Sequence, residues 1–83
     1  MTVELKIMTR NESTALPRVL RIISRQGCVL KKLVLQPIEE EKVLELSVLI
    51  DCPEVPFRLV KLLQKQILVI DVKMDQDNIA MAV

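Results

Sequence analysis

The chain has 83 residues, with twelve Lys and Arg against eleven Asp and Glu, and this length allows one small domain. It contains no His, Trp or Tyr, and one Phe. The lack of His excludes Ser-His-Asp and Cys-His nucleophiles and His-ligated metals. A net charge of +1 without aromatic platforms argues against nucleic-acid binding. Leu, Ile and Val fill 32 positions, so we expect a binding module with no catalytic residues, metal or cofactor.

Nothing in the sequence predicts export or membrane insertion. The N-terminus lacks the basic start and apolar run of a signal peptide, and no uncharged apolar stretch approaches the roughly 18 residues that span a bilayer. Cys28 and Cys52 are too few for a zinc cluster and too far apart for a CxxC redox pair. We therefore expect a cytoplasmic protein, without membrane contact, whose cysteines are structural thiols in a reducing compartment.

The first half of the chain predicts a strand, a helix and a second strand. Residues 2–8 alternate, with their apolar members on one side: Val3, Leu5 and Ile7. Helical spacing then joins Leu16, Val19, Leu20 and Ile23. Because Pro17 fits only the first turn of a helix, this helix begins near Ser13 or Thr14. It ends at Gly27, since glycine is common directly after a helix. Residues 28–36 form a strand whose alternation slips at Lys31-Lys32, which predicts a bulge or an exposed edge.

The second half predicts a turn, a strand, a helix and a last strand. Pro37 and Glu39–Glu41 make the turn, and the third strand points Leu44, Leu46, Val48 and Ile50 inward. Asp51, Cys52 and Pro53 open a helix that runs to about Gln66, with Pro56 restricting where its regular part begins. Its buried stripe is Phe57, Leu59, Val60 and Leu63. The strand 68–74 buries Leu68, Ile70, Val72 and Met74.

The order βαββαβ predicts an α+β, ferredoxin-like sandwich, with a four-stranded antiparallel sheet and both helices on one face. The first and third strands are central, and the second and fourth are edges. Residues 1–75 form the domain, and residues 76–83 a short C-terminal tail. On the open face of the sheet we expect Met8, Val43, Leu49 and Val69.

Because this fold carries unrelated functions, the site must decide between them. The first loop, residues 9–16, has no cysteine pair for a metallochaperone, and the central strands have no rings for RNA recognition. Arg10 lies near that loop, but without glycine the loop does not suit an acyl-phosphate hydrolase. Arg18, Arg21 and Arg25 form a stripe that is either a solvated helix face or a docking site for an acidic partner.

The first loop and helix carry a family resemblance, in the stretch Asn11-Glu12-Ser13-Thr14-Ala15-Leu16-Pro17-Arg18-Val19-Leu20 that ends in Arg25-Gln26-Gly27. It resembles, without gaps, the ACT-domain signature of acetolactate synthase small regulatory subunits, Asn-Glu-Pro-Gly-Val-Leu, one residue, Arg-Val, then Gln-Arg-Gly. Leu35-Gln36-Pro37-Ile38 and Val69-Ile70-Asp71-Val72 are similar to the same subunits. The resemblance covers about residues 2–74.

The resemblance implies an effector site, commonly for valine, between the first loop of one copy and the second strand of another. The candidate effector residues are Asn11, Glu12, Ser13, Thr14, Ala15, Leu16, Val29 and Leu30. The candidate dimer interface is Cys28, Val29, Leu30, Lys31, Lys32, Leu33 and Val34. Two departures weaken the effector site: the family's Pro-Gly is Ser13-Thr14 here, and Val29 stands where the family has Asn.

The resemblance implies a non-catalytic small subunit, similar to the short isozyme II type. It would bind and activate the thiamine-diphosphate catalytic subunit of acetolactate synthase in branched-chain amino-acid biosynthesis, with weak or no valine feedback. It would form a homodimer through second-strand edges, with a branched-chain amino acid as an optional ligand. The alternative is a free-standing ACT homodimer that binds an amino acid as a sensor in another pathway.

Overall fold

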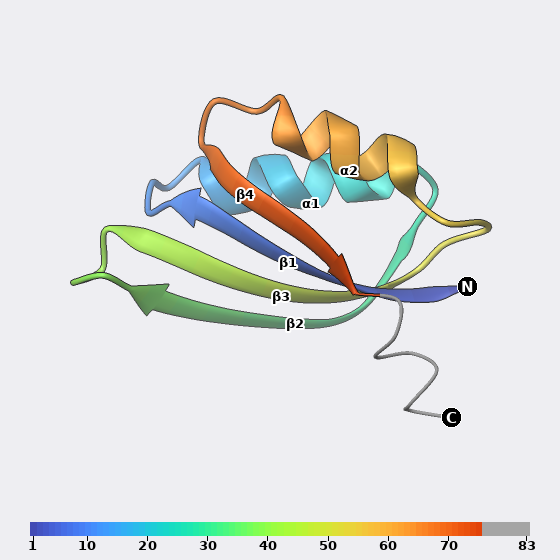
Figure 1. The fold of residues 1–83 in the computed structure, drawn as a ribbon, viewed down its shortest axis with the longest axis horizontal. Helices are drawn as coiled ribbons and strands as arrows, with labels where there is room; N and C mark the ends of the chain where they lie inside the picture. The colour runs from blue at the N-terminus through green and yellow to red at the C-terminus, as the bar shows by residue number, and fades with distance from the viewer. Residues whose placement is uncertain (76–83) are drawn as a thin grey trace.

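The computed structural model describes residues 1–75, and the expected tail, residues 76–83, lies outside them. The elements are β1 (Thr2–Arg10), α1 (Ala15–Arg25), β2 (Val29–Ile38), β3 (Val43–Asp51), α2 (Phe57–Gln64) and β4 (Val69–Asp75). The four strands pair antiparallel in the order β2-β3-β1-β4, and both helices cover one face of the sheet (Figure 1). The predicted ferredoxin-like fold, with β1 and β3 central, is confirmed.

The core lies between the central strands and the helices. Strict alternation in β1 and β3 gives fully buried side chains at Val3, Leu5, Ile7, Leu46, Val48 and Ile50. The helices close over them with Val19 and Ile23 of α1 and Leu59 and Leu63 of α2. Their four-residue spacing places each pair on one side of its helix.

The ends of α1 follow local backbone chemistry. Pro17 lies in the first turn, where its missing N–H has no helical acceptor. At the other end the Gly27 N–H donates to the Ser24 carbonyl, and Gly27 has φ of 77°, a left-handed conformation that favours glycine. This glycine turns the chain from α1 into β2.

The predicted burial is wrong at three positions around α2 and β4. α2 begins at Phe57, after Pro56, and its buried side is set by Leu59 and Leu63, so Phe57 is 62% exposed. In β4 a register shift against β1 between Met8 and Thr9 changes the side on which residues lie. Ile70 is therefore exposed, and Val69 packs against the core rather than on the open face.

β2 is an edge strand with an irregular start, as predicted. Its register against β3 shifts between Leu30 and Lys32, so Lys31 has no partner residue. The strand extends past its predicted end to Ile38 and includes Pro37, which belongs to the strand rather than the turn. Proline is tolerated there because the strand lies at an edge of the sheet.

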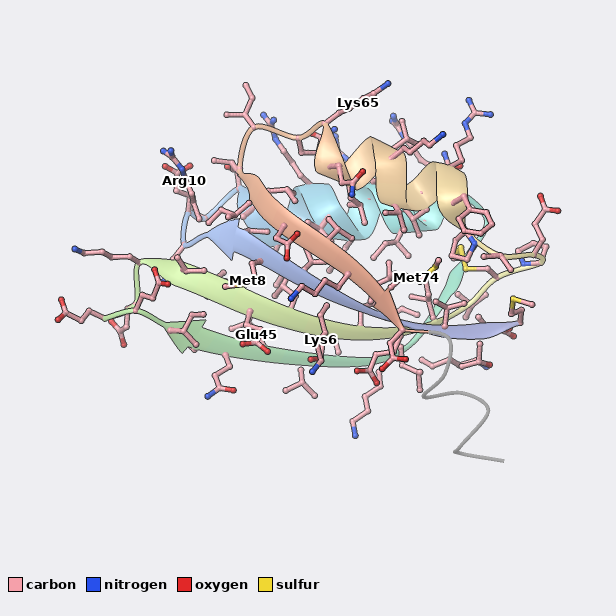
Figure 2. All side chains as sticks on the ribbon, viewed as in Figure 1. Lys6, Met8, Arg10, Glu45, Lys65 and Met74 are labelled. Carbon is pink, nitrogen blue, oxygen red and sulfur yellow. A yellow bond between two sulfur atoms is a disulfide. The ribbon has the colours of Figure 1, made fainter. Side chains whose placement is uncertain are left out.

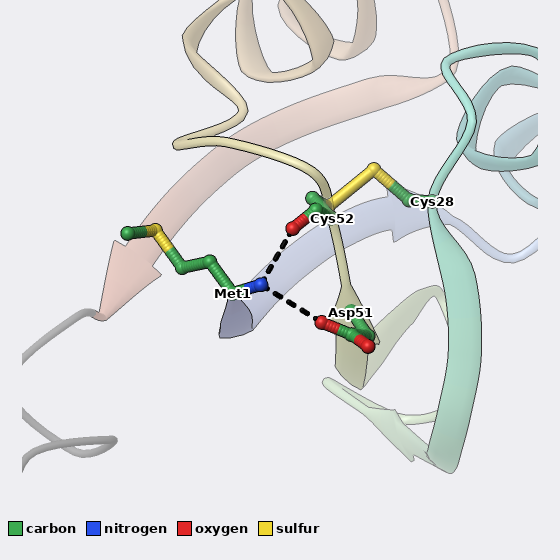
Figure 3. Close-up of a disulfide and its surroundings, with 4 residues drawn as sticks. All are labelled: Met1, Cys28, Asp51 and Cys52. Carbon is green, nitrogen blue, oxygen red and sulfur yellow. Dashed lines mark hydrogen bonds and ion pairs between the residues drawn. A yellow bond between two sulfur atoms is a disulfide. The ribbon is translucent and has the colours of Figure 1, made fainter.

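The two cysteines form a disulfide, which corrects the expectation of two separate thiols. Cys28 directly precedes β2 and Cys52 directly follows β3, and their Cα atoms are 4.4 Å apart. Next to this bond the Met1 ammonium donates to the Asp51 carboxylate (2.9 Å) and to the Cys52 carbonyl (2.6 Å), as Figure 3 shows. Sequence separation concealed this pairing, because the β2–β3 hairpin brings residues 24 apart to its two ends.

Within residues 1–75, neither helix is long and apolar enough to cross a membrane.

Candidate functional site

The first loop connects β1 to α1 and contains most of the candidate effector residues. Asn11, Glu12, Ser13 and Thr14 are exposed, while Ala15 is buried at the first position of the helix. Thr14 is the residue before the helix, with φ of −88° and ψ of −10°. These angles are ordinary for an L-residue, so the loop does not follow a path that only glycine can adopt.

The start of α1 offers little to bind an amino-acid carboxylate. Free N–H groups at a helix start can hold an anion. Here the Ala15 N–H donates to the Glu12 carbonyl (3.0 Å) and Pro17 has no N–H. The Leu16 N–H is left as the first-turn donor without a backbone acceptor in the described chain. A carboxylate placed at this helix start would therefore meet few free backbone N–H groups.

Asn11 is hydrogen-bonded to the tip of the β2–β3 hairpin. Its Nδ2 donates to the Glu41 carbonyl (2.7 Å), and its backbone N–H donates to the Lys42 carbonyl (3.0 Å). The side chain therefore holds the first loop against the hairpin tip. Its role in this structure is to join two loops, and one of the two Nδ2 N–H donors is used in that contact.

Val29 and Leu30 do not lie near the first loop of the same chain. β2 runs parallel to β1, so residue 29 lies opposite Asp51 beside the start of β1, whereas the loop follows the end of β1. Ile38, at the loop end of β2, is nine residue steps from Val29, roughly 30 Å at the usual rise. One chain brings residues 11–16 together, and a second copy is needed to bring residues 29 and 30 to them.

The outer edge of β2 is strongly apolar. Four of its residues are large, apolar and more than two-fifths exposed: Val29, Leu30, Val34 and Leu35. Lys31 and Lys32 are also exposed, and Leu33 is half-buried against the core. Cys28 differs from the other candidate interface residues, because it is 8% exposed and bonded to Cys52. An unpaired apolar edge is a place where another strand can add.

Thr9 is a buried polar residue at the loop end of β1 that our reading of the sequence did not assign. It is fully buried, and its Oγ1 has no hydrogen-bond partner in the described structure. The signal was available in the sequence, since Thr9 continues the inward side of Val3, Leu5 and Ile7. A buried hydroxyl without a partner is a local cost that an apolar residue of similar shape would avoid.

The hairpin tip beside Asn11 has an unusual backbone. Glu39, Glu40 and Glu41 have φ of 51°, 58° and 67°, all in the left-handed region. The Lys42 N–H donates to the Glu39 carbonyl (3.2 Å) and closes the turn. The left-handed conformation raises the energy of a residue that has a Cβ, and the three neighbouring carboxylates repel one another.

Residues 1–75 contain no cluster of three or more His, Cys, Asp or Glu that could hold a metal ion. A cavity of about 620 Å³ lies at the end of the molecule away from the first loop, between the disulfide and the start of α2. Phe57, Arg58, Glu54 and Gln26 are among its lining residues. None of the sequence-predicted effector residues lines it.

Comparison with solved structures places the chain among proteins with the ACT-type fold. The ACT domain of GTP pyrophosphokinase from Chlorobium tepidum superposes with a TM-score of 0.76 and 14% identity, covering 90% of this chain and 97% of that one. A formyltetrahydrofolate deformylase from Pseudomonas putida gives 0.70 and 15%, covering 90% of this chain and 28% of that one. The C-terminal domain of MgtC from Mycobacterium tuberculosis gives 0.68 and 18%, covering 89% and 84%.

At these identities the likeness shows a shared fold. No family model matches the chain, and no curated protein is detectably similar to it in sequence. The expected ACT-like, ferredoxin-like architecture is confirmed. These comparisons do not assign the chain to a particular enzyme complex.

Proposed function

We propose that this chain is a non-catalytic regulatory small subunit of acetolactate synthase. The observation that carries the proposal is the ungapped resemblance of residues 11–27 to that family's signature, on a chain whose fold is of the ACT type. The subunit would act by binding. A partner that binds the active conformation of a catalytic chain more tightly than its inactive one raises the population of the active conformation.

The proposal includes a homodimer in which two β2 edges pair antiparallel. The regular part of β2 lies between the bulge at Lys31 and Pro37, and Val34 is its centre. A twofold axis at Val34 would pair the two strands over this regular part. It would also carry residues 29 and 30 of one copy toward the first loop of the other, which completes the composite effector site.

That composite site would bind valine poorly. A bound amino acid needs donors for its carboxylate and acceptors for its ammonium group. The start of α1 offers the Leu16 N–H, Asn11 has one of its two amide N–H donors bonded to the hairpin, and Val29 brings a hydrocarbon side chain where the family has an amide. The proposed subunit would therefore support its enzyme with weak or no valine feedback.

Two measurements on the purified chain test this proposal. On size exclusion, a mixture with the catalytic subunit of acetolactate synthase should elute as one complex, and separate elution would contradict the proposal. In calorimetry, valine, leucine and isoleucine should give no saturable heat with the isolated chain. Saturable binding of one of them, without complex formation, would favour the alternative of a free-standing amino-acid sensor.

A further inference from the structure

The helix layer of this protein carries one sign of charge. α1 and α2, with Lys65 directly after α2, contain six of the chain's twelve Lys and Arg and none of its eleven Asp and Glu. The remainder of the chain therefore has six basic residues against eleven acidic ones. A chain of net charge +1 is divided into a cationic helix layer and an acidic remainder.

The basic residues repeat the same spacing on the two helices. Arg18, Arg21 and Arg25 lie at i, i+3 and i+7 on α1. Arg58 and Lys61 on α2, with Lys65 directly after it, have the same spacing. On a helix this spacing keeps each set on one side, over about 10 Å of axis. The helices contact one another on the same face of the sheet, so the two rows form one surface.

All six side chains of this surface are exposed. Within residues 1–75 none of them makes an ion pair with a carboxylate. Lys65 projects away from the sheet, whereas Lys6 and Glu45 lie on the opposite, open face, where both signs of charge are present (Figure 2). Six unpaired cations without a neutralising acid repel one another, and a carboxylate-bearing surface would relieve that repulsion.

We infer that the helix layer, rather than the open sheet face, docks an acidic patch of a partner protein. This deepens the proposed function and rests on it for the partner's identity, which would be the catalytic subunit. Four of the six cations are arginines, whose planar guanidinium groups bind carboxylates in a bidentate way. Half-buried apolar residues, Leu20 and Leu62, lie beside them and suit a protein surface.

A protein patch fits this surface better than a nucleic acid does. The whole chain has a pI of about 7.8, below the value typical of nucleic-acid-binding domains. A polyanion longer than the helix layer would run onto acidic parts of the molecule such as Glu39–Glu41. A second copy docking its own acidic hairpin here would build salt-sensitive rings or filaments, and these are an outcome of the test.

The test uses two matched double variants of the full chain. Arg21→Glu with Lys61→Glu reverses two charges in the helix layer, and Lys6→Glu with Lys73→Glu reverses two exposed charges that are neighbours on the open face. NMR titration with a decaglutamate peptide at 20 mM NaCl should shift amides of α1 and α2. The helix-layer variant should bind the peptide at least tenfold more weakly, and the open-face variant within about twofold of wild type.

Each other outcome of this titration has a definite meaning. Shifts that map to β1 and β4, or equal weakening in the two variants, would overturn the inference. Tighter binding of a ten-nucleotide DNA strand, or salt-sensitive oligomers beyond a dimer that the helix-layer variant abolishes, would overturn the choice of a partner protein. If the catalytic subunit binds neither wild type nor variants, the proposed function fails, while the peptide titration still decides which face is the docking surface.

Discussion

At the scale of single residues, the hairpin tip is held in a costly conformation. Glu40 has φ of 58° between two neighbours that are also left-handed, and a Cβ in this region costs roughly 1–2 kcal/mol. Glycine has no such cost. Glu40→Gly should raise the free energy of unfolding by about 0.5–1 kcal/mol in chemical denaturation, after the larger chain entropy of glycine is subtracted.

A matched control for this variant is Glu54→Gly, at an exposed position outside the left-handed region. It should leave stability unchanged or lower it. If Glu40→Gly lowers the free energy of unfolding as well, the left-handed turn does not describe the protein in solution.

Asp51 links stability to pH. Its hydrogen bond with the Met1 ammonium, and then that group's charge, lower the pKa of the carboxyl below its ordinary value of 3.8. A lowered folded pKa means that the ion pair stabilises the folded state above pH 3.8 and is lost as the pH falls through the folded pKa. Asp51→Asn should therefore lower Tm at pH 6, and the difference from wild type should shrink as the pH falls below 3.8. A difference that stays constant down to pH 2.5 would contradict this assignment.

At the scale of elements, the alternating strands could be predicted from sequence and the exceptions had local causes. The inward residues of β1 and β3 follow a period of two without interruption, so their burial is confirmed throughout. The predicted burial of Ile70 was wrong because the bulge opposite Met8 and Thr9 cannot be seen in the apolar pattern of β4. The predicted burial of Phe57 was wrong because helix periodicity alone does not show that α2 begins only after Pro56.

The candidate site was less predictable than the fold. The motif at residues 11–16 identifies a loop, but the bond from Asn11 to Glu41 depends on a hairpin thirty residues away. The disulfide and the separation of Val29 from the first loop also depend on strand pairing rather than on sequence neighbours. Contacts between distant segments depend on which strands pair. A periodic pattern in the sequence locates each strand but does not say which strand lies beside it.

The disulfide makes a prediction at the ends of the β2–β3 hairpin. Linking residues 24 apart removes chain entropy from the unfolded state, and breaking the link should lower the free energy of unfolding by about 3–4 kcal/mol. Thermal unfolding with and without a thiol reductant measures this. The double variant Cys28→Ser with Cys52→Ser should have the Tm of the reduced chain, and the reductant should not change that Tm. Equal Tm values for the untreated and reduced chain would restore the expectation of two separate thiols.

The two edge strands offer a matched pair of variants that test the proposed dimer. Val34→Lys places a charge at the proposed twofold axis on β2, where it would face its own copy, so the dimer dissociation constant should rise at least tenfold. Ile70→Lys adds the same charge at an exposed position on β4, the opposite edge. Sedimentation should show no change for it. Equal loss of dimer in both variants would argue against pairing through β2.

At the scale of the whole molecule, three surfaces have different chemistry. The β2 edge is apolar, the helix layer is cationic, and the open sheet face has both signs of charge. Small domains hide a limited share of their surface, so association through the apolar edge would add burial that one copy lacks. Self-pairing through the apolar edge would leave the helix layer free for a second partner, as the proposed subunit of an enzyme complex requires.

The most direct test of the central claim is to titrate this chain into the catalytic subunit of acetolactate synthase and measure its activity. We predict a saturable rise in activity that reaches a plateau at a defined ratio of the two chains. Valine at saturating concentration should leave the plateau nearly unchanged. An activity that stays at the level of the catalytic subunit alone, at every ratio, would contradict the account.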